Sequence, residues 1–343
     1  MMEAAHCATE PTFEHQGRRV EGRTMTTMTP EQMDLLALCA LRVESKSVDW
    51  NLLARICQSR EALDVVLSGD LPEDSAIARR NRPLLREALT SLTEARSRVA
   101  SECEAAERAG ARLVTVLDPD YPANLRVIPN LPPFLFYLGY LEERDARSAA
   151  VVGTRNASEE GLQRAARMAR GLVEHDVVVF SGLAKGVDTA AHTATVEAGG
   201  RTVAVMGTGI ANKIYPAQNK SLAARIVESG GALVSQFWPT SSAATWTFPR
   251  RNVVTSGSTM GSIVVEASST SGAKMQARIA HEHGKHVFLL RSLATKEPWA
   301  AKMIAERKAV EVTELSDVLE LMGEATRVQQ AGQQRLQLTL AGL

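Results

Sequence analysis

The sequence predicts an α/β protein in which an open, doubly wound and mostly parallel sheet follows a small all-helical domain. From residue 111 onward, short valine-rich runs alternate with amphipathic helical stretches, the pattern of parallel strands and their crossover helices. Aromatic residues make up only 4% of the 343 residues, so aliphatic side chains must fill most of the core, as parallel sheets favour. No strand pattern precedes Ala111, which sets the front segment apart.

These patterns divide the chain into four expected segments. Residues 1–28 are a polar, disordered lead-in, and residues 29–110 are the helical domain, whose first helix begins at a cap-like Thr29-Pro30-Glu31-Gln32. Residues 111–322 form the sheet domain. Residues 323–343 are rich in glutamine and too few for a further domain, so we expect a tail.

Within the sheet domain, strands and helices are expected to alternate. Strands are expected at residues 112–118, 134–139, 149–154, 177–182, 202–209, 232–237, 262–268 and 286–292. Helices are expected at residues 159–176, 187–200, 219–231 and 273–284, with a last helical segment that ends at Met322. Residues 245–257, "TWTFPRRNVVTSG", are expected to form an irregular loop.

The charge is unevenly distributed although the formal net charge is zero. Residues 1–150 carry 18 Lys+Arg against 23 Asp+Glu, whereas residues 151–291 carry 15 against 9. A basic middle segment beside an acidic front segment indicates that the middle part meets an anion.

Compartment and metal content follow from what the sequence lacks. No apolar run reaches the roughly 18 residues that a membrane helix needs, and no export signal is expected at the start, so we expect a cytoplasmic protein without membrane contact. The four cysteines are scattered without a CxxC pair, which fits a reducing compartment and argues against a zinc site. We therefore expect no metal and no cofactor.

Several predicted strands end in glycines and cations, as sites for anions do. In an open parallel sheet, ligands bind outside the carboxyl ends of the strands, where helix N-termini present free N–H groups. The candidate anion-binding residues at these exits are Arg155, Ser181, Gly182, Lys185, Ser271, Gly272 and Lys274. The alternative is that the glycines only make turns. A dinucleotide is not expected, because "GTGIAN" breaks the GxGxxG pattern, and no P-loop pattern is present.

The expected loop at 245–257 adds a second kind of ligand contact. Arg250 and Arg251 are suited to gripping phosphate, and Asn252 follows them. Phe248, and with it Trp246, could stack on a nucleobase, as aromatic residues do in basic grooves that bind single strands. The alternative is a surface loop with a solvated charge pair.

Signs of catalysis are weak. Asp188 and His192 lie four residues apart and could pair on one helix face. His281 and His283 would point away from each other on a helix, which disfavours a metal site. No nucleophile elbow, HExxH motif or close carboxylate pair is present, so we expect a binding protein and not an enzyme.

Five motifs in order resemble the DNA-processing protein A (DprA/Smf) family: "VGTR", "VVFSGLAKGVDTAAH", "GGRTVAVMGTGIANKIYPAQN", "FPRRN" and "VVEASSTSG". The lead-in "YPANLRVIPNLPPFLFYLG" is similar to that family as well. The resemblance implies a Rossmann-like fold, a SAM-like helical N-terminal domain and sequence-independent binding of single-stranded DNA. It also implies a homodimer and the loading of RecA recombinase onto incoming single strands in natural transformation.

The resemblance assigns DNA contacts by motif. They are Arg155, Ser181, Gly182, Lys185, Arg250, Arg251 and Asn252. Residues 272–278, "GAKMQAR", depart from the family's "GSLITAR", which affects the expected dimer contact and RecA-facing surface more than the DNA groove.

A rival hypothesis is a hydrolase or sensor of a nucleotide-derived small molecule with the same broad fold. Such relatives carry a PGGxGTxxE motif, whereas the corresponding "TSGSTMGSIVVEA" lacks both the PGG and the GTxxE spacing. Glu266 is the one candidate acid, and it is expected to end a strand.

Overall fold

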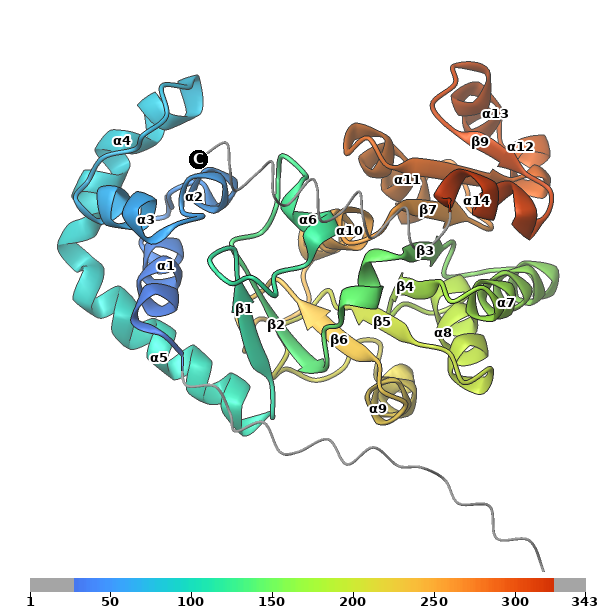
Figure 1. The fold of residues 1–343 in the computed structure, drawn as a ribbon, viewed down its shortest axis with the longest axis horizontal. Coiled ribbons are helices and arrows are strands. Elements are labelled where there is room, and N and C mark those ends of the chain that lie inside the picture. Colours follow the sequence, from blue (N-terminus) through green and yellow to red (C-terminus); the bar gives the residue numbers. More distant parts are fainter. Residues whose placement is uncertain (1–27, 324–343) are drawn as a thin grey trace, which may run out of the picture.

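The computed structural model describes residues 28–323, drawn in Figure 1. Helices between residues 30 and 108 form a lobe at one end of the molecule, and a nine-stranded, mostly parallel sheet with helices on both faces forms the rest. This arrangement confirms the predicted fold class. The expected lead-in and tail lie outside the described residues, except for Met28 and Gly323.

The helical lobe is built from five helices, four of which begin at a side-chain N-cap. They are α1 (Pro30–Ala40), α2 (Trp50–Ile56), α3 (Arg60–Leu67), α4 (Ala76–Ala88) and α5 (Leu92–Arg108). At the start of the first four, the side chains of Thr29, Asp49, Ser59 and Ser75 accept backbone N–H groups that would otherwise lack partners. Thr29 and Gln32 form a capping box, which confirms the predicted start of the first helix.

The strands lie in the spatial order β1-β2-β6-β5-β4-β3-β7-β8-β9. They are β1 (Arg112–Thr115), β2 (Phe134–Gly139), β3 (Ser148–Val152), β4 (Val178–Gly182), β5 (Thr202–Val205), β6 (Ala232–Ser235), β7 (Gly261–Val264), β8 (His286–Leu290) and β9 (Val310–Val312). Pairing is parallel from β6 through β9, whereas β1 with β2 and β2 with β6 are antiparallel. The strand order reverses at β3, because β4 to β6 extend to one side and β7 lies on the other.

The edge strand β9 lies where the sequence predicts a helix. It has three residues, of which Val310 and Glu311 are exposed. Such a short edge strand gives neither an apolar run nor a sustained alternation, so its pattern could not be told from the flanking helices.

Helices cover both faces of the sheet. They are α6 (Ala123–Arg126), α7 (Glu159–Glu174), α8 (Val187–Glu197), α9 (Lys220–Glu228), α10 (Thr247–Gly257), α11 (Gly272–Glu282), α12 (Arg291–Lys296), α13 (Pro298–Ala305) and α14 (Leu315–Met322). Apolar residues of α7, α8 and α14 form one hydrophobic cluster with strand residues such as Val151 and Ile263. Residues of α10 and α11 join the larger cluster on the opposite face, with Val152 and Val264.

Helix α10 corrects the expected loop at residues 245–257. The segment has no side-chain N-cap and contains Pro249 and several β-branched residues, all of which disfavour a helix prediction. Pro249 is tolerated because it lies in the first turn, where its missing N–H has no helical partner to lose. Val254 is fully buried, so packing against the sheet stabilises a helix that local propensity does not.

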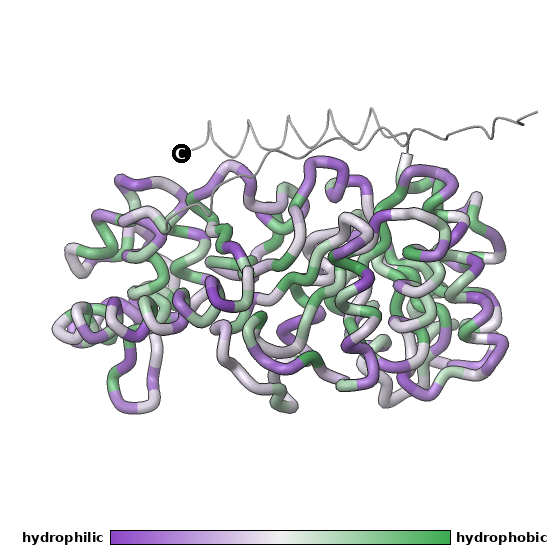
Figure 2. The backbone as a smooth tube through the Cα atoms, turned by 90° about the horizontal axis from the view of Figure 1, so that it is seen from below, coloured by the Kyte–Doolittle hydropathy of each residue, from purple (hydrophilic) through white to green (hydrophobic). Residues whose placement is uncertain are grey.

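The lobe and the sheet share one hydrophobic core. Trp50 of α2 packs on Phe134 of β2 with ring centroids 5.3 Å apart, and on Trp238 after β6 at 5.8 Å. Gln32 donates to Asp118 at 2.8 Å across the same junction. In Figure 2 the hydrophobic segments run through the interior of both parts, whereas hydrophilic segments lie on the outside.

Arg201 directly precedes β5 and links three segments at the end of the sheet opposite the carboxyl ends of its parallel strands. Its side chain is 3% exposed and grips Asp145 with two hydrogen bonds, at 2.6 and 2.7 Å. It also reaches Glu142 at 3.2 Å and donates to the backbone carbonyls of Tyr140 and Gly230. Glu142 also pairs with Arg144 at 2.6 Å, whereas Asp145, which is 12% exposed, has Arg201 as its one ion-pair partner among the described residues, so losing Arg201 would leave the Asp145 carboxylate without a cation.

We expect Arg201→Ala to lower the free energy of unfolding by about 3–5 kcal/mol, because it breaks a buried ion network from one side. Arg144→Ala is the matched control: Arg144 binds the same Glu142 at 2.6 Å but is 61% exposed, so we expect a loss below about 1 kcal/mol. Urea unfolding measures both. Equal losses for the two variants would contradict the network's role.

Candidate functional site

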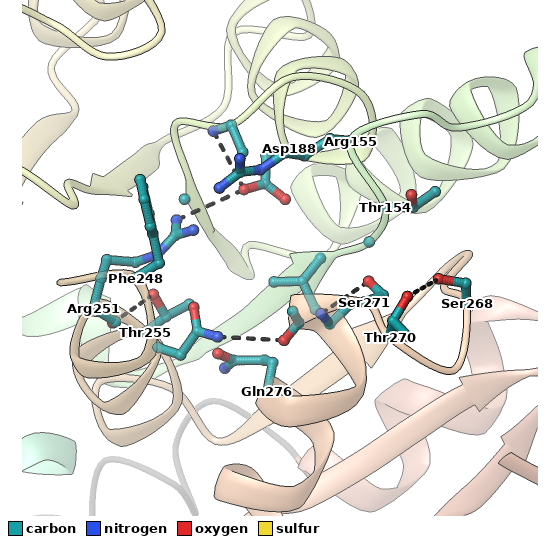
Figure 3. Close-up of a pocket in the computed structure, with 17 residues that line it drawn as sticks. Thr154, Arg155, Asp188, Phe248, Arg251, Thr255, Ser268, Thr270, Ser271 and Gln276 are labelled. Atoms are coloured by element: carbon teal, nitrogen blue, oxygen red, sulfur yellow. Dashed lines mark hydrogen bonds and ion pairs between the residues drawn. The ribbon is translucent and has the colours of Figure 1, made fainter. Parts of the chain in front are cut away.

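A pocket lies where the strand order reverses, outside the carboxyl ends of β3 and β7. Ligands of open α/β sheets bind at such a switch point. The pocket has a volume of about 280 Å³ and is shown in Figure 3. Its walls come from the loop after β3, the loop after β4, the loop after β7, and helices α10 and α11. The sequence predicts an anion site at these strand ends. We call this cavity the switch-point pocket.

A buried ion pair closes the floor of the switch-point pocket. Arg251 of α10 lies 3.7 Å from the carboxylate of Asp188 in α8, and their side chains are 11% and 6% exposed. The Arg251 guanidinium also donates to the carbonyl of Val205 at 3.3 Å. A Cβ on Gly182 would overlap Nη1 of this guanidinium and lie 2.6 Å from the Asp188 carboxylate, so any other residue there would displace the ion pair. The Arg251 guanidinium thus occupies the space that a side chain at position 182 would fill.

Burial affects both partners of this pair. It raises the pKa of the Asp188 carboxyl, although the nearby Arg251 guanidinium acts in the opposite direction. It lowers the pKa of Arg251 for the same reason. The Nε of Arg251 is buried and has no hydrogen-bond partner. The contacts to Asp188 and to the Val205 carbonyl both engage Nη1 of Arg251, so this nitrogen is not free to bind a ligand.

Asp188 and His192, whose spacing would allow them to pair on one helix face, form no such pair. The ring nitrogens of His192 lie 2.7 Å from the Gly182 carbonyl and 2.7 Å from the Thr202 hydroxyl. Burial lowers the pKa of His192 to about 4, so the ring is neutral near pH 7. His192 therefore joins α8 to β4 and β5.

Exposed cations and aromatic rings continue from the switch-point pocket along the strand ends. The Arg155 guanidinium lies 4.9 Å from the ring centroid of Phe248, whose other neighbour, Tyr215, is 5.8 Å away. A Cβ on Gly207 would come within 3.0 Å of the Phe248 ring, so the ring lies directly on the glycine backbone. Lys185 and Tyr215 line an adjoining hollow of about 50 Å³. We call the switch-point pocket and this hollow together the rim.

Arg155 and Lys185 supply the positive charge of the rim. Both are exposed, and neither forms an ion pair with an Asp or Glu within residues 28–323. Tyr215 is 49% exposed beside them. Unpaired cations next to an accessible ring can contact phosphate and base at once.

The first turn of α10 separates the two arginines that the sequence predicts to act together. Arg251 points into the switch-point pocket, whereas Arg250 is exposed, lies 5.7 Å from the ring centroid of Trp246 and lines a different groove. Asn252 lines the switch-point pocket and donates to the Gly272 carbonyl at 3.3 Å. Successive helical residues project about 100° apart, which explains the separation.

Four further predicted residues occupy different positions. Ser271 lines the switch-point pocket, as does Gly272, and caps α11 by accepting from Ala273 at 3.1 Å. Ser181 is fully buried, and its hydroxyl donates to the Val151 carbonyl at 2.6 Å, so its side chain does not reach the pocket. The ammonium of Lys274 lies 5.9 Å from the ring of Trp299, outside the pocket lining.

The structure adds residues that sequence reasoning missed. Thr255 and Gln276 line the switch-point pocket one helical turn after Arg251 and Gly272, and Tyr215 lines the adjoining hollow. Reading 247–257 as a helix would have placed Thr255 on the same face as Arg251. The "KIYPAQN" segment that contains Tyr215 was recognised only as part of a longer motif.

Glu266, the one candidate acid of the rival hypothesis, has a structural role. Its carboxylate accepts from the Ser158 hydroxyl at 2.7 Å, and its backbone carbonyl accepts from Thr154 at 2.7 Å. Ser158 in turn caps α7. The carboxylate therefore fixes the start of a helix, where negative charge is stabilised by the helix dipole.

Two features are absent from the described part of the chain: a cluster of metal ligands and a helix able to span a membrane. Between residues 28 and 323, no group of three or more His, Cys, Asp or Glu could hold a metal ion. Within the same range, no helix combines the length and the apolar character that crossing a membrane requires.

Comparisons with known proteins agree with the motifs. The family model described as "DNA recombination-mediator protein A" matches residues 112–323, more than half of the chain. The chain is 33% identical to Protein Smf of Escherichia coli over 72% of this chain and 66% of that protein. It is 39% identical to DNA processing protein DprA of Streptococcus pneumoniae over 51% of this chain and 61% of that protein. It covers 46% of the Synechocystis Protein Smf at 37% identity.

Solved structures show the same fold. The X-ray structure of DprA from Streptococcus pneumoniae superposes with a TM-score of 0.65 and 29% identity, covering 85% of this chain and 97% of that one. DNA processing protein A from Helicobacter pylori, studied for its single-stranded DNA binding mode, superposes with a TM-score of 0.54 and 21% identity over 62% of this chain and 97% of that one. Motifs, family match and fold agree: this chain belongs to the DNA recombination-mediator protein A family, the DprA/Smf proteins.

Proposed function

We propose that this chain binds single-stranded DNA along the rim, without sequence preference and without turnover. The observation that carries the proposal is the row formed by Lys185, Arg155, Phe248 and Tyr215, in which unpaired cations adjoin accessible rings. Cations that follow a phosphate backbone and rings that stack on any base are the two parts of single-strand binding without sequence readout.

The polar groups of the switch-point pocket favour binding over catalysis. Asp188 is committed to Arg251, and the carboxylate of Glu266 to Ser158. The amide of Asn252 donates to a backbone carbonyl, which leaves it poorly placed to read base edges. A site with fixed charges and stacking surfaces suits a ligand that is held and passed on.

Family membership supports two finer parts of the proposal. We propose that the bound strand is handed to a RecA recombinase in the cytoplasm, as a recombination mediator does, and that the protein acts as a homodimer. RecA filament formation on strands coated with single-strand-binding protein, followed with and without this chain, tests the first part. Sedimentation tests the second.

We expect Arg155→Ala and Lys185→Ala each to weaken binding to all single-strand sequences alike, by roughly fivefold at moderate salt. Each should also reduce the slope of log affinity against log salt by about 0.7, because one fewer phosphate is neutralised. Fluorescence anisotropy of a labelled oligonucleotide over a salt series measures both. Arg251→Ala is a poor probe, because it also removes the partner of buried Asp188.

Arg167→Ala is the matched control for these two variants, since Arg167 is exposed on α7, away from the rim. We expect it to bind like the wild type. If the rim variants keep wild-type affinity and salt slope, the single strand does not lie on the rim, and nucleotides should be screened against the switch-point pocket instead.

A second prediction concerns the glycine under the ion pair. We expect Gly182→Ala to displace the Arg251 guanidinium, to lower the free energy of unfolding by about 3 kcal/mol and to weaken DNA binding, because Asp188 loses its partner. Gly272→Ala is the control for stability: a Cβ there meets no atom within 4 Å and its φ is ordinary. Thermal unfolding of the two variants decides; an unchanged Gly182→Ala protein would contradict the steric argument.

A further inference from the structure

A second concavity of about 1000 Å³ lies between the helical lobe and the sheet. One wall comes from residues 42–51 and from α4, and the other from residues 236–241 and the start of α10. The rim lies on the other side of the first turn of α10. We call this concavity the inter-lobe groove.

Cations line the inter-lobe groove without ion-pair partners. Arg42, Lys46, Arg80 and Arg250 are all exposed, and none lies within 4.0 Å of an Asp or Glu carboxylate among the described residues. The carboxylates of the lining belong to Glu44, Asp49 and Glu87. Asp49 is occupied as the cap of α2, accepting from Leu52 at 2.8 Å. The groove lining thus carries four cations without ion-pair partners against three carboxylates, one of which caps a helix, and this small excess of positive charge favours an anionic ligand.

An accessible indole lies among these cations. Trp246 is 56% exposed and is held edge-on against Phe237, with ring centroids 5.8 Å apart. Arg250 lies 5.7 Å from the Trp246 ring centroid. A large exposed ring beside unpaired cations repeats the combination found on the rim, where Arg155 adjoins Phe248.

The walls of the groove are held by buried contacts. Asn81 of α4 donates to the carbonyl of Ile77 at 2.9 Å and accepts from the backbone of Asp49 at 2.9 Å, which fixes α4 to the start of α2. On the floor, Trp50 donates to the Cys39 carbonyl at 2.9 Å while packing on Trp238. The groove is therefore already formed, and binding a ligand would cost little free energy for ordering its walls.

The first turn of α10 connects the groove to the rim. Phe248 and Arg251 of this turn line the rim, whereas Trp246 and Arg250 line the groove. A strand that crosses this turn can therefore stack on an aromatic ring and meet an exposed arginine on either side, Arg155 on the rim and Arg250 in the groove. The groove and the rim are two sections of one basic, aromatic surface.

We infer that the inter-lobe groove is a second binding section for the same single strand, continuing its path from the rim toward the helical lobe. In this inference, which rests on the proposed function, Trp246 stacks on a base and Lys46, Arg80 and Arg250 contact phosphates. The helical lobe is then a wall of the DNA site. Short strands fill the rim alone, and longer strands gain affinity from the groove.

The test compares oligo(dT) of about 6 nucleotides with oligo(dT) of about 20, since binding modules of this kind cover about 4–16 nucleotides. We expect Trp246→Ala to weaken binding of the longer strand roughly tenfold, and Trp246→Phe to keep most of the wild-type affinity, while neither variant changes binding of the short strand.

The Lys46→Ala/Arg80→Ala variant should reduce the slope of log affinity against log salt by about 1.4 for the longer strand only. Arg79→Ala is the control, since Arg79 adjoins Arg80 but pairs with Asp74 at 3.2 Å outside the groove.

The outcomes separate this inference from the proposed function. If the groove variants leave affinity for the longer strand unchanged while Arg155→Ala and Lys185→Ala weaken both strands, the rim binds DNA and the groove inference is wrong. Equal weakening of both strands by the groove variants would also overturn it, because the groove would not be a separate section. If the wild-type protein binds neither strand at low salt, the proposed function itself fails.

Discussion

The buried ion pair between Arg251 and Asp188 is the constraint on which the geometry of the site depends. It joins α10 on one face of the sheet to α8 on the other, across the end of β4. The pair fits only because Gly182 lacks a Cβ. Taking two charges out of water is costly, so a pair like this does more to fix one arrangement of the strand ends than to stabilise the fold. The exposed Arg155 and the half-buried Phe248 of the rim depend on that fixed arrangement.

The strand order explains why the site lies where it does. The sheet grows from β3 toward β6 and then resumes with β7 on the other side of β3, so the connecting chain has to cross the strand ends. Helix α10 lies in this crossing and divides the surface in two. One adjacent pair of arginines thereby serves two surfaces: Arg251 secures the rim, and Arg250 faces the groove beside the helical lobe.

Much of this could be predicted from the sequence, because strand exits leave local signals. Valine-rich runs ending in glycine and a cation predicted that Arg155 and Lys185 lie together at the strand ends, and both line the same hollow there. Three things could not be predicted. Burial stabilises α10 although its residues have low helix propensity. The ion-pair partner of Asp188 is Arg251, 63 positions away, and not the neighbouring His192. The Ser181 side chain points into the core and donates to the Val151 carbonyl of β3. Each depends on contacts between distant segments, which local patterns do not record.

The central claim is that a single strand lies across the carboxyl ends of the parallel strands. Photo-crosslinking of an oligonucleotide that carries 5-iodouracil, followed by mass spectrometry of the adducts, tests it most directly. The account predicts adducts on the peptides that contain Tyr215 and Phe248, whose rings lie on the rim. Adducts confined to the opposite edge of the sheet, around Arg147 and the Arg201 network, with none on those two peptides, would contradict it.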